Sequence, residues 1–394
     1  MKYRFGTCEL DLTAHEFRRD GQRIALEPQV FSLLALFVQN QGALVSREHI
    51  INDIWGGRII SDAALSSRIN ALRRALQDDG KSQAVLETVT RCGFRFLPSV
   101  TAVEDVAHPL PLATSAPQRI RVTRSADGTR IAFAVSGTGP PLLRAGHFLT
   151  HLDHDRHSPI WQPFLDRLDR QFSTVRYDQR GTGLSDDSAT RYDLEALVDD
   201  MAAVADSAGI ARFPILAASQ GVPVSIAYAA RHPDRVSSMV LYGGYAQGRA
   251  IRGSIEERAM GEAMLSMIRQ GWGREPAFAD AFTTIFIPDA TPAIRAGMVQ
   301  MQMQSASAEN AVALRRAIDG FDVSHLLEQV HIPVLVIHAR GDSVHPLSQA
   351  KLLAAGLPNA DLTVLDSRNH VPLPTDPAWE DLMQAITSFL SQPQ

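Results

Sequence analysis

The stretch ILAASQGVPVSIAYAA (residues 215–230) sets one serine, Ser219, between two apolar segments of different kinds. A strand-like run ends at Ala218, and an apolar segment of helical length begins at Val222. The residues on both sides of Ser219 are small, as a sharp turn between a strand and a helix requires. The stretch therefore predicts a nucleophilic serine held on a strained turn.

The residues around this stretch indicate the fold of the C-terminal part. From Ile120 onward, strand-like segments alternate with helical ones, and the later strands read PLLRA, STVRYD, PILAAS, SSMVLYG, PVLVIHA and DLTVLD. Strands separated by helices favour an α/β fold, a mostly parallel sheet with helices on both faces. Ser219 then lies at the carboxyl end of a central strand, where such sheets bind ligands.

Two later strand ends carry the partners that a nucleophilic serine needs. Asp342 follows PVLVIHA, and His370 follows DLTVLD. The order Ser, Asp, His at successive strand ends resembles the α/β-hydrolase fold over residues 118–392. This resemblance implies that Ser219 is the nucleophile, His370 the general base and acid, and Asp342 its orienting partner. Ala217 departs from the pattern, because relatives usually carry glycine there.

The resemblance also implies an oxyanion hole formed by the backbone amides of Gln220 and Phe148. In the loop LLRAGHFLTH, His147 stands where relatives commonly carry glycine, so we expect its side chain to narrow the pocket or reorient the donor.

Four histidines of this region, His147, His151, His154 and His157, lie near two aspartates, Asp153 and Asp155. One loop rarely supplies a full set of metal ligands, so we expect these histidines to line the pocket entrance or face solvent. The sequence predicts neither a metal nor a cofactor.

A helical cap is expected between the strands at 238–243 and 334–339, over about residues 246–328. It holds six of the ten methionines. The candidate ligand-pocket residues are His147 of the loop and, in the cap, Met260, Met264, Met267 and Trp272. Methionine adapts to irregular apolar shapes, so the cap suits a partly apolar ligand. Ordinary core packing would explain the same composition equally well.

The first hundred residues show strand-like segments, three helical segments and a final hairpin-like pair. The third helical segment, about residues 62–76, carries an apolar stripe of Leu65, Ile69, Leu72 and Leu76. Its remaining surface offers side chains that suit base edges and phosphates: Ser67, Arg68, Asn70, Arg73 and Arg74. The helix alone favours a simpler interpretation, the solvated face of a core helix.

This order of elements resembles the winged-helix effector domain of OmpR/PhoB-type regulators over residues 3–97. The matching stretches are LEPQVFSLLALF, LVSREHIINDIWG, SSRINALRRAL and TVTRCGFRF, and the last is similar to the ToxR/CadC-like branch. The resemblance implies double-stranded DNA as partner, Arg91 of the wing as a minor-groove contact, and a homodimer on paired half-sites.

The distribution of prolines and charged residues indicates how the chain is divided into domains. Residues 98–118 contain four prolines and no regular periodicity, so we expect a winged-helix domain at 1–98, a linker at 99–118 and a hydrolase domain at 119–394. The formal charge is −5, yet residues 1–100 hold 13 Lys and Arg against 11 Asp and Glu, which permits DNA binding without requiring it.

We expect a cytoplasmic protein without a membrane partner. The longest apolar runs are far shorter than the roughly 20 residues that a transmembrane helix needs. The N-terminus does not resemble a signal peptide, and the chain has only Cys8 and Cys92.

Two functions fit these observations. The first is a one-component transcriptional regulator that senses a small molecule in a hydrolase-like pocket, with or without hydrolysing it through a Ser-His-Asp triad. The alternative is an esterase-type serine hydrolase, acting on an ester or amide, that uses the winged helix mainly for assembly.

Overall fold

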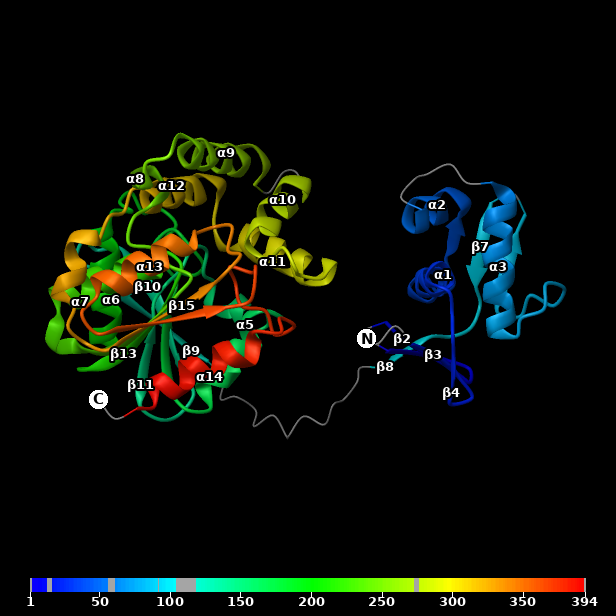
Figure 1. Cartoon of the computed structure of the whole chain (residues 1–394), viewed down its shortest axis with the longest axis horizontal. Helices are drawn as coiled ribbons and strands as arrows, with labels where there is room; N and C mark the ends of the chain where they lie inside the picture. The colour runs from blue at the N-terminus through cyan, green and yellow to red at the C-terminus, as the bar shows by residue number, and fades with distance from the viewer. Residues whose placement is uncertain are drawn as a thin grey trace. The chain divides into compact units, whose positions relative to one another are not determined.

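The computed structural model describes residues 2–12, 16–55, 61–90, 92–103, 118–272 and 276–392. The chain divides into two compact units, residues 1–113 and residues 114–394, each with its own hydrophobic core (Figure 1). Within the described residues, no helix combines the length and the apolar composition needed to cross a bilayer.

The first unit has the winged-helix arrangement that the sequence predicts. One antiparallel sheet has the strand order β4-β3-β2-β1-β8: Gln22–Ile24, Glu16–Arg19, Cys8–Asp11, Lys2–Phe5 and Thr101–Val103. The helices are α1 Pro28–Gln39, α2 Arg47–Trp55 and α3 Asp62–Leu76. A three-stranded sheet has the order β5-β7-β6: Leu44–Ser46, Gly93–Phe96 and Leu86–Val89.

Helix α3 is fixed by its caps and its apolar stripe. The Ser61 hydroxyl accepts a hydrogen bond from the amide of Ala64, which satisfies one free donor of the first turn. Gln77 ends the helix in the left-handed conformation. The four predicted stripe residues, Leu65, Ile69, Leu72 and Leu76, are all buried in the core of this unit.

The expected linker differs from the structure at its start. Residues Thr101–Val103 form strand β8, which pairs with β1 in antiparallel register. The edge of β1 offers unpaired backbone groups that these residues satisfy, and a strand of three residues is too short to leave a periodic signal in the sequence. Most of the remaining expected linker, residues 104–117, lies outside the described residues.

The second unit is built on an eight-stranded sheet with the order β16-β15-β14-β13-β11-β12-β10-β9. In that order the strands are Ala360–Leu365, Val334–Ala339, Val236–Tyr242, Phe213–Ala218, Pro141–Arg144, Ser173–Tyr177, Arg130–Ser136 and Arg119–Arg124. Only the pairs involving β10 are antiparallel among these described strands. The mostly parallel α/β sheet expected from the sequence is confirmed.

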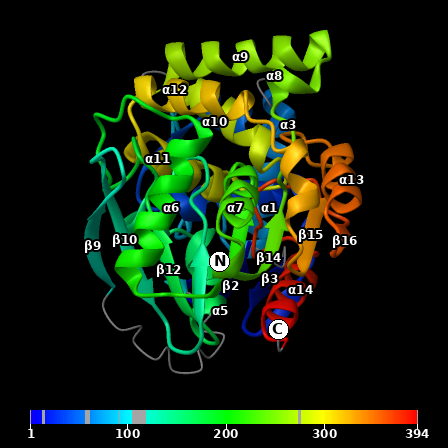
Figure 2. The same ribbon diagram turned by 90° about the vertical axis from the view of Figure 1, so that its left-hand side faces the viewer.

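Helices cover both faces of this sheet. Residues of α6 Leu194–Ala208, α7 Gly221–Arg231 and α13 Leu347–Gly356 share one buried cluster with one face. Residues of α5 Trp161–Asp169 and α14 Trp379–Leu390 share another cluster with the opposite face. Figure 2 shows α6 and α7 side by side in front of the sheet. The strand ends between the two layers are the expected place for a site.

A helical cap follows β14 and precedes β15, as expected. It comprises α8 Arg249–Arg252, α9 Ile255–Gly271, α10 Pro276–Phe286, α11 Pro292–Ser305 and α12 Ala308–Asp319. Figures 1 and 2 both show α9 as the outermost of these helices, and α9 packs on α10 and α12. Three short helices complete the unit: Leu152–Asp155, which is α4, Pro233–Arg235 and Ser324–Gln329.

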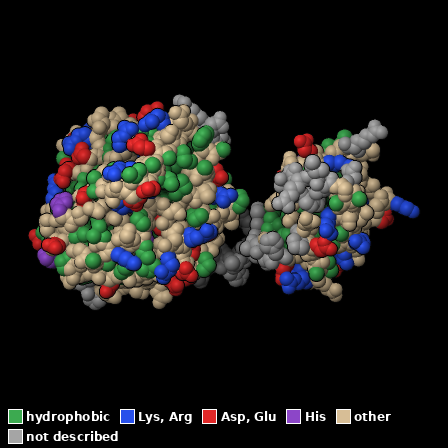
Figure 3. Space-filling model, turned by 45° about the horizontal axis from the view of Figure 1, so that its top comes forward, with side chains coloured by type: hydrophobic (Ala, Val, Ile, Leu, Met, Phe, Trp, Pro, Cys, Tyr) green, Lys and Arg blue, Asp and Glu red, His purple; other side chains and the backbone are tan. Residues whose placement is uncertain are grey.

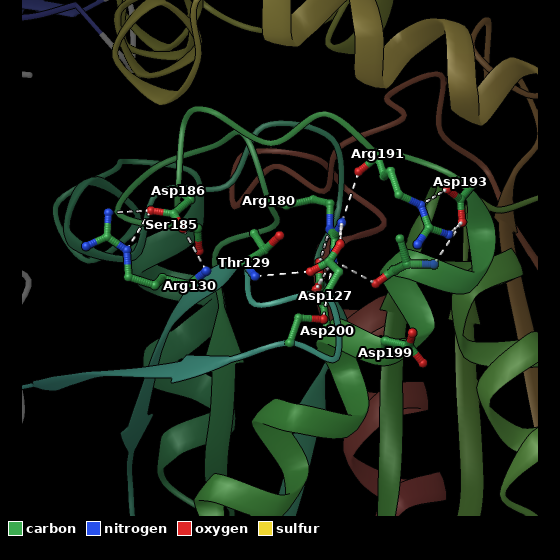
Figure 4. A network of polar contacts seen from close by, with 12 residues as sticks. Asp127, Thr129, Arg130, Arg180, Ser185, Asp186, Arg191, Asp193, Asp199 and Asp200 are labelled. Atoms are coloured by element: carbon green, nitrogen blue, oxygen red, sulfur yellow. Dashed lines mark hydrogen bonds and ion pairs between the residues drawn. The ribbon is translucent and has the colours of Figure 1, made fainter.

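A buried ion network holds the loop that follows β12 (Figure 4). The Arg180 guanidinium binds both carboxylate oxygens of Asp200 at 2.7 and 2.8 Å, and reaches Asp127 at 2.7 Å. The side chains of Arg180 and Asp200 are almost wholly buried. Gly181 and Gly183 adopt φ values of 76° and 55°, which suit glycine in a tight turn.

Replacing Arg180 by leucine should lower the free energy of unfolding by about 3–5 kcal/mol, because Asp200 is left buried without its cation. Urea unfolding followed by tryptophan fluorescence measures the loss, since three of the four tryptophans lie in the second unit. The matched control is Arg191→Leu, which removes an exposed pair with Asp193 and should cost less than about 1 kcal/mol. Equal losses in the two variants would contradict the expectation.

Candidate active site and DNA-reading surface

The turn between β13 and α7 presents Ser219 in a strained conformation. Its φ is 53°, in the left-handed region that a serine seldom adopts. Ala217, which stands where relatives usually carry glycine, is completely buried, and its small side chain fits this position. Gly221 lies so close to the neighbouring loop that a Cβ atom there would stand 2.8 Å from the Gly146 carbonyl oxygen. Glycine is therefore required for α7 to begin where it does.

The structure brings the three predicted residues together at the carboxyl ends of β13, β15 and β16. His370 Nε2 lies 2.9 Å from Ser219 Oγ, and His370 Nδ1 lies 2.7 Å from Asp342 Oδ2. The other oxygen of Asp342 accepts the amides of Val344 and His345 at 2.7 and 3.1 Å. The carboxylate is thus fixed in its orientation toward the imidazole.

The charge on Asp342 suits His370 to act as a base. Burial by itself would raise the pKa of Asp342, but the facing His370 and the hydrogen bonds outweigh burial and lower that pKa below its ordinary value. An ionised Asp342 requires the proton of the imidazole to sit on Nδ1. Nε2 is then left to accept the proton of the Ser219 hydroxyl.

The two amides assigned to the oxyanion hole lie beside this group. Within the described part of the chain, the backbone amides of Phe148 and Gln220 donate to no oxygen atom. Gln179 donates to the carbonyl oxygen of His147 at 2.5 Å and accepts from the Gln220 side chain. The His147 carbonyl and the Phe148 amide belong to one peptide unit, so Gln179 fixes the direction of that amide.

A mostly apolar pocket, partly open to solvent, lies over Ser219 and His370. His147 lines it, as the sequence analysis predicts. Burial, followed by the nearby charge of Arg144, holds the pKa of His147 well below its ordinary value, so the side chain is neutral at pH 7. Other lining residues come from β14 and the cap: Tyr242, Phe286, Met298, Met301 and Gln302.

The four cap residues predicted for the pocket do not line it, so that prediction is wrong. Met260 is exposed on the outer helix α9, and the sulfur of Met264, on the same helix, accepts a hydrogen bond from Arg249. Met267 is partly buried and packs against the hydrophobic core, and the ring centres of Trp272 and Phe282 lie 5.8 Å apart.

The inner cap helix is α11, and the sequence carries a signal for it that the analysis missed. Met298, Met301 and Gln302 have the spacing i, i+3 and i+4, which puts them on one helical face toward the cavity. Apolar side chains also reach the outer surface of the cap (Figure 3), namely Ile251, Ile255, Met260, Phe278 and Met303. Apolar composition therefore does not distinguish the inner cap helix from the outer ones.

The other histidines of the same region have local roles. His151 Nδ1 accepts the amide of His154, and a ring nitrogen of His157 lies 3.0 Å from the carbonyl oxygen of Asp153. Among the described residues, no group of three or more His, Cys, Asp or Glu side chains is placed to hold a metal ion.

In the first unit, α3 presents an exposed polar stripe. Ser67, Asn70 and Arg74 are exposed, and so is Ser66, which the sequence analysis missed although it precedes Asn70 by one helical turn. Arg68 is half-buried and binds Glu27 and Gln29 at the start of α1.

Arg73 is a correction to the predicted DNA-binding set. Its side chain is buried, donates to Asp78 at 2.6 Å and donates to Thr88 of β6 at 2.9 Å. Asp78 also accepts the amides of Val85 and Leu86. Arg73 therefore anchors α3 to the wing and is not available to DNA. The predicted wing contact Arg91 lies outside the described residues.

Comparison with known families agrees with both units. The family described as "Transcriptional regulatory protein, C terminal" matches residues 21–96, and the family described as "alpha/beta hydrolase fold" matches residues 149–272. The chain is therefore a fusion of an OmpR/PhoB-type DNA-binding domain with an α/β-hydrolase-fold domain.

Individual relatives match the second unit. The candidate carbamate hydrolase RutD of Caulobacter vibrioides is 28% identical over 59% of this chain and 85% of its own length. Pyrrolizixenacetamide deacetylase of Xenorhabdus hominickii is 26% identical over 66% of this chain and 94% of its own. Among solved structures, the esterase RhEst1 of Rhodococcus is 25% identical with a TM-score of 0.57, over 69% of this chain and 98% of its own.

A fluorophosphonate probe, which phosphonylates activated serines, should label the intact protein at Ser219. Labelling should disappear in Ser219→Ala and slow by about 10³–10⁴-fold in Asp342→Asn, because the imidazole loses its orienting carboxylate. Asp366→Asn is the matched control, since Asp366 is an exposed aspartate next to β16. Mass spectrometry of the labelled peptide gives the rate, and undiminished labelling of Ser219→Ala would exclude Ser219 as the nucleophile.

Proposed function

We propose that this protein is a one-component transcriptional regulator. In this proposal α3 and the wing bind double-stranded DNA, and the cavity of the second unit binds and hydrolyses a small, partly apolar ester or amide. The observation that carries the proposal is the presence, on one chain, of a DNA-binding domain and a pocket lined by Ser219 and His370, which are in hydrogen-bonding contact with each other and, through His370, with Asp342.

The proposed hydrolysis uses each group in turn. Ser219 Oγ attacks the carbonyl carbon while His370 Nε2 takes its proton, and the amides of Phe148 and Gln220 receive the negative oxygen. His370 then returns the proton to the leaving group, and water releases the acyl group by the reverse sequence. The named activities of the relatives, a deacetylase and an esterase, support an amide or ester as the substrate class.

The proposed regulation needs a ligand that binds one arrangement of the protein better than another. Five cap helices separate β14 from β15, and two of them contribute side chains to the cavity, so the cap is the element that ligand occupancy would order. We further propose a cytoplasmic homodimer on paired half-sites, as winged-helix regulators of this type use. Hydrolysis would remove the ligand and reset the regulator.

The contacts among the three site residues also fit a second candidate function. A serine hydrolase that uses its N-terminal unit only for assembly would need the same contacts among Ser219, His370 and Asp342. It would not need the exposed polar stripe of α3, which is the reason we favour the regulator.

Arg74→Ala should weaken binding of the purified protein to promoter fragments about equally across sequences if Arg74 contacts a phosphate. It should also lower the slope of log affinity against log salt by about one. If Arg74 contacts a base, the loss should be about 1–3 kcal/mol at one sequence position. Fluorescence anisotropy over a salt series measures both quantities.

Arg23→Ala is the control for this experiment. Arg23 is an exposed arginine on β4 whose loss changes the net charge equally. Wild-type affinity and salt slope in Arg74→Ala would favour the hydrolase that uses its first unit for assembly.

A further inference from the structure

A second cavity lies next to the one that contains Ser219, and its wall is charged. It is small, and most of its lining is apolar. Four residues, Trp161, Ala218, Tyr242 and Pro372, line both cavities. Arg144 lines the second cavity and not the first. Ala218, which directly precedes Ser219, is one of these shared residues, so the second cavity lies close to the candidate nucleophile.

Arg144 is buried without adequate compensation. It is the last residue of β11, and its register partner on β12 is a second arginine, Arg176. Asp155 is the carboxylate that both arginines share. Its Oδ2 lies 3.9 Å from Arg144 Nη1 and 3.7 Å from Arg176 Nη1, and both distances exceed hydrogen-bonding distance. Arg176 also binds Gln118. Within the described part of the chain, Arg144 Nη2 has no hydrogen-bond partner.

The surroundings of Arg144 are apolar. Its guanidinium lies 4.6 Å from the ring centre of Trp161 and 5.7 Å from that of Phe164, and the residue is 5% exposed. Stacking on aromatic rings compensates only part of the lost hydration of a buried cation. Burial lowers the pKa of Arg144 to about 10, so the group still carries its charge at pH 7. Arg144 therefore shares Asp155 with Arg176 and makes no ion pair shorter than 3.9 Å within the described part of the chain.

We propose that Arg144 binds a carboxylate of the ligand. The ligand class is then an ester or amide that also carries a carboxylate at the far end of a short apolar spacer. The spacer would run past Trp161 and Tyr242, which line both cavities, from the carbonyl group at Ser219 to the guanidinium. A carboxylate matches the planar fork of a guanidinium and would supply the missing acceptor to Nη2. This inference rests on the proposed function only in placing the ligand over Ser219.

The test compares two series of esters on the full chain. The first series contains the mono-4-nitrophenyl esters of glutaric to suberic acid, and the second contains neutral 4-nitrophenyl alkanoates of matching length. At one or more lengths, wild-type kcat/KM should favour the acid ester by at least about tenfold, and Arg144→Met should lose at least about tenfold of that preference. No preference at any length in the wild type overturns the inference.

Two further variants separate recognition from packing. Arg144→Lys keeps a positive charge and should retain part of the preference, whereas a purely steric role predicts the same loss as in Arg144→Met. The matched control is Arg121→Met, because Arg121 is an exposed arginine that stacks on Phe133 at 4.6 Å. An equal loss of preference in Arg121→Met would overturn the assignment to Arg144.

Calorimetry distinguishes a failure of this inference from a failure of the proposed hydrolysis. If the wild type turns over no ester, titration of the full chain with the monomethyl esters of the same diacids measures binding directly. Binding that is at least about tenfold weaker in Arg144→Met supports a carboxylate site without hydrolysis. No binding by the wild type, or equal binding by wild type and variant, overturns the inference. Unfolding followed by tryptophan fluorescence shows that each variant is folded.

Discussion

The close approach of α7 to the loop after β11 is the constraint on which the candidate site depends. Gly221 lies against the Gly146 carbonyl with no room for a Cβ atom, and Ser219 adopts a positive φ to enter the helix at that point. The approach puts the amide of Gln220 beside the loop that carries Phe148. The site then needs only Asp342 and His370, which follow β15 and β16 at the same edge of the parallel sheet.

Chain order and local periodicity were sufficient to predict the sheet and the stripe of α3, and the resemblance to the α/β-hydrolase fold added the set of Ser219, Asp342 and His370. These features depend on where strands end and on helical spacing, which the sequence shows directly. The cavity wall could not be predicted in the same way. Met264 and Met301 belong to the same apolar cap, and only packing between helices decides that α11 lies inside and α9 outside.

The neighbours Arg73 and Arg74 illustrate the same limit on α3. Their side chains project about 100° apart on the helix, so one reaches the wing and the other reaches solvent. The contact that buries Arg73 comes from Asp78, which follows the helix end, and from Thr88 on β6. The turn that brings these groups to Arg73 is a tertiary feature. Residue type alone would assign both arginines to DNA.

Gln179 connects two parts of the second unit that look independent. Its side chain holds the His147–Phe148 peptide, and the next residue along the chain is Arg180, the centre of the buried ion network. Folding stability and the aim of the proposed oxyanion donor are therefore anchored in one short loop. If the protein hydrolyses its ligand as proposed, substitutions in this loop would change how long the protein keeps its ligand. A substitution there would slow turnover while Ser219, His370 and Asp342 stayed intact, so an unchanged triad need not mean a fast enzyme.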